Sequence, residues 1–140
     1  MKAKLERKLR ELEFDGKECA TYEPVDAVEA DLGKSLPIDL REILLASDGI
    51  ALSSEWHELQ IWSCEEIVAH NRANQVQKHT PDFLMFGSNG AGETFTLDYR
   101  TKPVSIVLVP AIGFDYKSAI HVADDFFGLL TRLQEAQPLL

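Results

Sequence analysis

The apolar residues of this chain change their spacing once, and this change limits the folds available to it. In the first third they recur every three or four positions, as on one face of a helix. From Phe83 onward they form short continuous runs or alternate with polar residues, as strands do. Helices followed by strands predict an α+β fold with helices packed on a sheet. A chain of 140 residues is long enough for one domain with its own core, so we expect a single domain over residues 1–140.

Three helices are predicted in the first third. Their apolar stripes are Leu5, Leu9 and Leu12; Val25, Val28 and Leu32; and Leu40, Ile43 and Leu44. Pro24 and Pro37 suit the first turns of the second and third helices, where a missing N–H costs nothing. Each stripe is followed by a stop signal containing glycine, namely Asp15-Gly16, Gly33 and Asp48-Gly49.

The middle of the chain predicts a strand followed by a well-marked helix. Alternation over residues 56–62 is typical of a half-buried strand. Ser63 and Glu66 have the spacing of a capping box, and Trp62 and Ile67 occupy the positions of a hydrophobic staple around it. One face of this helix is expected to carry Cys64, Ile67, Val68 and Asn71.

Four further strands and a final helix are predicted after residue 82. The strands are expected at 83–86, 94–99, 104–109 and 119–122, with a glycine loop at 87–92 and an exposed loop at 112–118. Asp124 is the predicted cap of the last helix. The apolar positions of that helix are Phe126, Phe127, Leu129, Leu130 and Leu133.

The charge of the chain is strongly negative and unevenly distributed. The formal net charge is −9, and five basic residues fall within the first ten positions. The rest of the chain carries nine basic and 22 acidic residues, a net charge of −13. Such a surface repels nucleic acid and attracts a basic protein, although a negative surface also simply keeps a protein soluble.

We expect a cytoplasmic protein, because the sequence predicts no targeting signal and its cysteines fit neither a disulfide framework nor a zinc site. The charged N-terminus is not followed by an apolar block, so no secretory signal is predicted, and no apolar run approaches the length of a membrane span. Cys19 and Cys64 are too few for a disulfide framework and fit no zinc pattern, so we expect two reduced thiols.

Sequence motifs for catalysis or cofactors fail on inspection. Residues 87–94 have the glycine spacing of a phosphate-binding loop, but Glu93 stands where a lysine must neutralise phosphate. The predicted alternative is a tight connection between two strands, with Asn89-Gly90 at positive φ. The four histidines show no metal-ligand spacing, and Ser88 lies outside a hydrolase elbow. We therefore predict no catalytic residues, no metal and no cofactor.

Several sequence blocks together resemble the SUKH superfamily, which includes yeast cell-wall-synthesis regulators and bacterial immunity proteins. Residues 36–49 are similar to its Leu-Pro helix with an Asp-Gly stop, and residues 62–71 to its capped central helix. Residues 86–100 look like its strand and glycine loop, and residues 104–130 like its closing strand and Ala-Asp-Ser-Phe ending, with Asp125 in place of the serine. The resemblance covers residues 22–133 as the core of the domain, with residues 1–15 as an additional amphipathic helix.

The resemblance implies a mixed, mostly antiparallel sheet with helices packed on it. It also implies an immunity protein that binds and neutralises a cognate toxin, often a nuclease, whose basic surface would match the negative charge of this chain. A monomer or weak homodimer is expected. The alternative is a housekeeping scaffold module of the cell-wall-regulator type, and a third reading is a hydrolase that uses His121 with Asp124 or Asp125.

Under the immunity hypothesis, acidic loop residues would attract the partner and one or two aromatic residues would anchor it. Trp56, Trp62, Phe114 and Tyr116 are the aromatic residues considered, and Trp62 is better explained as the staple. The predicted partner-binding residues are Glu55, Trp56, Glu58, Glu93, Asp98, Asp115 and Tyr116.

Overall fold

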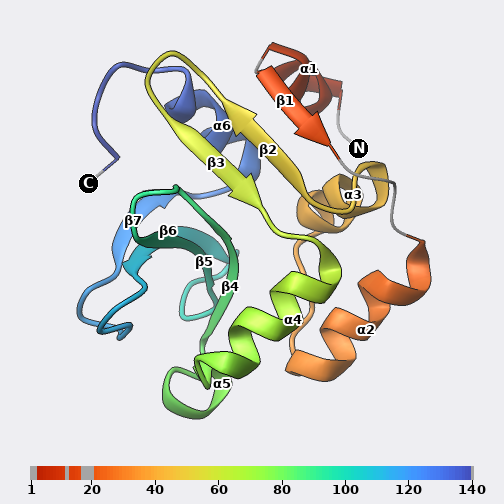
Figure 1. Ribbon diagram of the computed structural model, residues 1–140, viewed down its shortest axis with the longest axis vertical. Coiled ribbons are helices and arrows are strands. Elements are labelled where there is room, and N and C mark those ends of the chain that lie inside the picture. Colours follow the sequence, from red (N-terminus) through yellow and green to blue (C-terminus); the bar gives the residue numbers. More distant parts are fainter. Residues whose placement is uncertain (1–2, 12, 17–20, 140) are drawn as a thin grey trace.

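The computed structural model describes residues 3–11, 13–16 and 21–139, and it confirms the α+β fold (Figure 1). The helices are α1 (Ala3–Glu11), α2 (Tyr22–Leu32), α3 (Ile38–Ala46), α4 (Cys64–Ala73), α5 (Val76–His79) and α6 (Phe126–Leu133). The strands are β1 (Glu13–Gly16), β2 (Ile50–Ser53), β3 (Glu58–Ile61), β4 (Phe83–Ser88), β5 (Glu93–Asp98), β6 (Ser105–Pro110) and β7 (Ile120–Ala123).

The described strands form one seven-stranded sheet in which the order of strands follows the sequence from β1 to β7. All pairs of neighbouring strands are antiparallel, so the described sheet contains no parallel pair. Strand β3 pairs with β4 only where Gln60 faces Ser88 and Ile61 faces Gly87. The rest of β4 on that side faces α4, which packs beside α2 (Figure 1).

The helix signals in the sequence correspond to the helices that form. Gly33 adopts the left-handed conformation at the end of α2, with φ of 69°. The side chain of Ser63 accepts a hydrogen bond from the Glu66 N–H, and the Glu66 carboxylate accepts one from the Ser63 N–H, so the predicted capping box is present. Helix α3 ends at Ala46, and Gly49 follows with φ of 95°.

One predicted helix stop is wrong, because residues 13–16 form a strand. Asp15 and Gly16 pair with Ala51 and Ile50 of β2, while α1 already ends at Glu11. The free edge of β2 offers hydrogen-bond partners that a local glycine signal cannot reveal. Leu12, the third residue of the predicted stripe, lies outside the described residues.

Helix α1 packs against α6 at the end of the chain. Leu5 is buried, and the ammonium groups of Lys4 and Lys8 lie 4.6 and 5.7 Å from the centre of the Phe127 ring. Lys8 also donates a hydrogen bond to Gln134. Part of the basic N-terminal segment is thus engaged by an aromatic ring of the same protein.

The cap of α6 is Asp125, and the prediction of Asp124 from local spacing is wrong. Asp125 has an extended backbone, and its Oδ1 accepts a 2.7 Å hydrogen bond from the Gly128 N–H. Asp124 instead approaches His121, with 2.9 Å between Oδ1 and Nε2. Both aspartates precede the helix, and the position at which the backbone turns helical decides which of them caps it.

Replacing Asp125, the cap, should therefore destabilise the protein more than replacing its neighbour Asp124. Asp125→Ala is expected to lower the free energy of unfolding by about 1 kcal/mol, because the Gly128 N–H loses its acceptor. Asp124→Ala serves as the matched control and should change stability by less than about 0.5 kcal/mol. Urea unfolding followed by circular dichroism measures both, and an equal loss in the two variants would show that Asp125 is not the cap.

Aromatic side chains pack on both faces of the sheet. On the face covered by α6, the Phe86 ring contacts the rings of Phe95 and Phe126. On the opposite face, Phe114 and Tyr116 from the loop at 111–119 meet Phe83 edge to face, with ring centres 5.7 and 4.8 Å apart. The loop predicted as exposed is therefore exposed at its tips and packed at these two rings.

Cys64 is a buried free thiol with 4% of its surface exposed. Burial, with the nearby Asp48 carboxylate, raises the pKa of this thiol to about 12, so it stays protonated at neutral pH. Cys19 lies outside the described residues. No helix in the described part of the chain is both long and apolar enough to cross a membrane.

Candidate functional site

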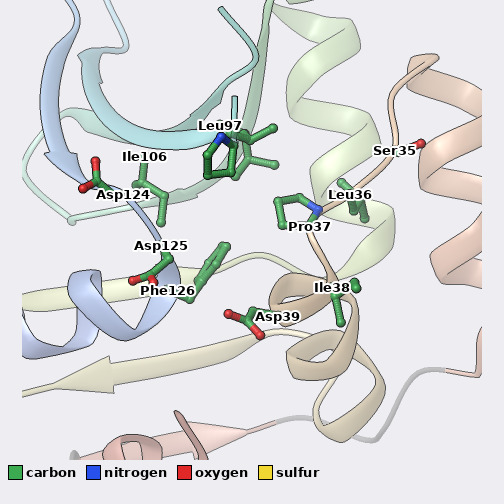
Figure 2. Close-up of a pocket in the computed structure, with 12 residues that line it drawn as sticks. Ser35, Leu36, Pro37, Ile38, Asp39, Leu97, Ile106, Asp124, Asp125 and Phe126 are labelled. Carbon is green, nitrogen blue, oxygen red and sulfur yellow. The ribbon is translucent and has the colours of Figure 1, made fainter. Parts of the chain in front are cut away.

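A groove of about 570 Å³ opens where the start of α3, the β5–β6 region and the start of α6 meet (Figure 2). Its floor includes Leu97 of β5, Ile106 of β6 and Phe126 of α6, all of which are buried in the core. One wall is the segment 35–39, which joins α2 to α3. The volume lies in the range of pockets that hold small ligands or partner side chains.

The rim of the groove carries an unusually exposed aliphatic residue. Ile38, the first residue of α3, is 74% exposed, although most large apolar residues of the chain are buried. Pro37 and Val104 are partly exposed beside it along the groove. A concave apolar surface with an exposed isoleucine at its edge is typical of a contact surface for another molecule.

Three carboxylates flank this apolar surface, and they come from two different elements. Asp39 lies in the first turn of α3, while Asp124 and Asp125 lie between β7 and α6. In the view of Figure 2, the Phe126 ring lies between Asp39 and Asp125. The groove has no basic residue among those that line it. Its chemistry therefore favours an apolar group accompanied by positive charge.

The wall at 35–39 is held in place by side chains from two other elements. The Glu29 carboxylate of α2 accepts a 2.6 Å hydrogen bond from the Leu36 N–H. The Tyr99 hydroxyl donates a 2.8 Å hydrogen bond to the Ser35 carbonyl, and burial raises the pKa of Tyr99, so its hydroxyl keeps this proton. The groove is thus formed before any partner arrives.

Two cations close to this wall in the sequence are engaged within the protein. The guanidinium of Arg41 pairs with Glu29 and with Asp26 of α2, and its hydrogen bond to Asp26 is the main reason its pKa is raised. The Lys34 ammonium lies 5.2 Å from the centre of the Tyr99 ring. These contacts direct positive charge toward α2 and Tyr99.

Three of the sequence blocks that resemble the SUKH superfamily contribute to the groove, the first through residues 36–39, the second through Leu97 and the third through Val104, Ile106 and residues 124–126. A comparison with family models gives a match to the SMI1 / KNR4 family (SUKH-1) over residues 19–132. The chain belongs to this family. No curated protein matches the chain. In this SUKH-1 domain, residues 36–39 and 124–126, which are at least 85 positions apart in sequence, thus meet at one surface feature.

The predicted partner-binding residues of this SUKH-1 chain fall into two other places. The first is the hairpin patch, which consists of Glu55, Trp56, Glu58 and Glu93. Trp56 lies between β2 and β3 and is 52% exposed, and the Glu58 carboxylate lies close to Gly90 of the glycine loop. A smaller hollow of about 280 Å³ adjoins Trp56 and Glu58, and Pro138 and Leu139 form part of its lining.

The second place is an internal cluster around Arg100. Asp98 is buried and receives two hydrogen bonds of 3.0 Å from the Arg100 guanidinium, which raise the pKa of Arg100. This guanidinium lies 5.0 and 4.8 Å from the ring centres of Phe83 and Tyr116. The Tyr116 hydroxyl accepts a hydrogen bond from the Asp82 N–H. Asp98 and Tyr116 therefore hold a loop onto the sheet.

Asp115, from the same loop, is exposed. It accepts a 2.8 Å hydrogen bond from the Ser118 N–H, and hydrogen bonds from Ser118 lower the pKa of its carboxyl. The structure thus brings Glu55, Trp56, Glu58 and Glu93 toward one end of the sheet and leaves Asp98, Asp115 and Tyr116 elsewhere.

Asp98 provides a direct test of its structural role. Asp98→Asn should lower the free energy of unfolding by about 1–3 kcal/mol, because a buried charged hydrogen-bonding partner of Arg100 is lost. Asp115→Asn, on the exposed part of the loop, should leave the unfolding midpoint nearly unchanged. Guanidinium unfolding curves compare them, and an unchanged midpoint for Asp98→Asn would show that the pair with Arg100 contributes nothing.

Residues considered for catalysis do not assemble into a site. His121 and Asp124 form an exposed pair beside α6, and His121 does not line the groove. The described residues include no group of three or more His, Cys, Asp and Glu residues that could hold a metal ion. The glycine loop runs directly into β5, and Gly90 and Gly92 have positive φ. The side-chain oxygen of Asn89 accepts hydrogen bonds from the Ala91 and Glu93 N–H groups. The loop is a tight connection between strands, although Asn89 itself does not take positive φ.

The groove cannot be predicted from the sequence, because the spacing of its apolar residues is that of ordinary core residues. Their periodicity predicts strands for Leu97 and Ile106 and a helix for Phe126, but it does not indicate that these residues share a concave surface. A signal was available at Ile38, an apolar residue that lies off the stripe of Leu40, Ile43 and Leu44.

Proposed function

We propose that this SUKH-1 chain is a non-enzymatic immunity protein that binds a basic toxin, a nuclease domain, and occludes it. The observation that supports this best is the groove, in which an apolar floor is flanked by Asp39, Asp124 and Asp125 and no lining residue is basic. A small-molecule enzyme would need polar groups converging on a reacting atom, whereas this surface offers apolar contact and negative charge.

The net charge of the chain supports a basic partner. Nucleases bind the phosphate backbone through lysine and arginine, so their active surfaces are positive. A protein of formal net charge −9 attracts such a surface and accelerates the encounter at low ionic strength. Carboxylates placed where phosphates would lie then compete with the nucleic acid for the same cations.

Co-expression tests the proposal. The probe is the C-terminal domain encoded by the gene adjacent to that of this chain, expressed from an inducible promoter with and without the immunity candidate. We expect growth to be rescued and the two proteins to purify together, with an association rate that falls as salt rises. Continued growth arrest with no co-purification would contradict the immunity function and favour the scaffold module.

A further inference from the structure

We infer that the groove holds one extended segment of the partner, in which a single aliphatic side chain lies between lysine or arginine residues. This inference rests on the proposed function and adds to it the docking site and the chemistry of the segment that fills it. It follows from three features of the groove: its apolar floor, the placement of its carboxylates and its fixed wall.

The apolar floor provides the anchor position. Leu97, Ile106 and Phe126 close the bottom of the groove, and the exposed Ile38 stands at its edge. An aliphatic side chain placed here covers Ile38 and removes apolar surface from water on both molecules, which contributes about 25 cal/mol per Å² buried. Central apolar anchors surrounded by polar contacts are the usual source of affinity at protein interfaces.

The carboxylates define what flanks the anchor. Asp39 lies on α3, whereas Asp124 and Asp125 lie at the β7–α6 junction, where their carboxylates turn outward from the Phe126 ring (Figure 2), so acidic residues stand at two edges of the floor. Because the Arg41 and Lys34 side chains are engaged elsewhere, these two cations do not neutralise the rim. The His121 imidazole contacts Asp124 at 2.9 Å, and the Asp124 side chain stays largely exposed to a partner. A segment with cations on both sides of its anchor matches this pattern, whereas an acidic segment or a phosphate backbone is repelled.

The fixed wall lowers the cost of binding. Hydrogen bonds from Leu36 to Glu29 and from Tyr99 to Ser35 tie the segment 35–39 to α2 and to the end of β5. A preformed groove loses little conformational freedom when it is filled, so more of the contact energy appears as affinity.

The hairpin patch has a smaller hollow whose lining includes Pro138 and Leu139. We therefore assign the primary contact to the groove.

The test uses synthetic peptides and the whole protein labelled with ¹⁵N. The first peptide has the sequence Gly-Lys-Arg-Leu-Lys-Arg-Gly, the second replaces leucine by serine, and the third replaces every basic residue by glutamate. We expect the first to shift amide resonances of residues 36, 38, 39, 104–106 and 124–126 and to bind at least tenfold more tightly than either control. Tighter binding of the glutamate peptide, or shifts centred on Trp56 and Glu58, would overturn the inference.

Two isoleucines give matched variants. Ile38→Lys places a positive charge at the groove, and Ile112→Lys makes the same change in the loop at 111–119, where Ile112 is 94% exposed. Both should fold as the parent does, because both side chains lie largely in water. We expect Ile38→Lys to weaken binding of the basic peptide at least tenfold and Ile112→Lys less than twofold. Equal effects would contradict the groove as the docking site.

The same pair separates this inference from the proposed function. If the toxin domain is neutralised equally by the parent and by Ile38→Lys, the immunity function holds and the groove is not the contact. If the basic peptide binds the groove but no toxin domain is neutralised, the docking site holds and the immunity function fails.

Discussion

Asn71→Leu is expected to lower the free energy of unfolding by about 2–6 kcal/mol, because it leaves two buried backbone groups without partners. Asn71 is fully buried in α4. Its side-chain oxygen accepts a hydrogen bond from the Met85 N–H at 3.0 Å, and its amide donates one to the Met85 carbonyl at 2.8 Å. The same amide also reaches the Ile67 carbonyl, so the side chain links its own helix to β4.

The reason for this arrangement is that β3 separates from β4 beyond Gly87. The edge of β4 that would meet a neighbouring strand at Met85 meets α4 instead. Asn71 supplies the donor and the acceptor that a strand would have supplied, and Gln77 donates to the next free carbonyl, that of Phe83. Leucine fills a similar volume but has neither group.

Asn74→Leu is the matched control, because Asn74 ends the same helix but is exposed to solvent. Its amide donates only to the His70 carbonyl, and water can replace that bond. We expect a change below about 1 kcal/mol for this variant. Urea unfolding at neutral pH measures both, and a similar loss in the two would show that Asn71 does not carry the link between α4 and β4.

Gly87→Ala is expected to lower the free energy of unfolding by about 3 kcal/mol, since the added methyl group has no room. A Cβ at this position would lie 2.3 Å from the carbonyl oxygen of Gln60 and 3.4 Å from the Cα of Ile61. These are backbone atoms of the paired strand β3, so no side chain can rotate away and the strands must move apart.

Gly92→Ala distinguishes steric conflict from backbone preference. Gly92 has φ of 99°, and a Cβ there would meet no other heavy atom within 4 Å. Gly92→Ala should therefore lower the free energy of unfolding only through the left-handed backbone that alanine must adopt, by about 1–2 kcal/mol. In thermal unfolding, Gly87→Ala should therefore have a lower midpoint temperature than Gly92→Ala. Amide exchange in β3 should become faster only in Gly87→Ala. The reverse order would contradict the close approach of the strands.

Local signals in the sequence predicted those elements whose causes are local. The capping box at Ser63 and Glu66, the left-handed Gly33 and the buried strand beginning at Phe83 each depend on residues within one or two turns. The strand at 13–16 depends on β2, which follows more than 30 residues later, so a local stop signal was misread there. Asn71 was placed on the buried face of its helix, but its role depends on where β3 ends.

The candidate site was less predictable because surface charge does not show which acids are already paired. The charge of Asp98 favours a surface role, yet Arg100 lies two positions further along the strand direction, where side chains share a face. That spacing was a usable sign of an internal ion pair. The groove required three separate chain segments to be placed together, and no spacing rule connects Ile38 with Ile106 and Phe126.

In the proposed complex, a basic protein partner covers the groove between α3, β6 and α6. The test is hydrogen–deuterium exchange, measured on the free chain and after mixing with the C-terminal domain that the adjacent gene encodes. We expect slower exchange in the complex at residues 35–39, 103–106 and 124–126, with little change at 54–58 and 89–93. Protection confined to 54–58 and 89–93, with the groove segments unchanged, would contradict it.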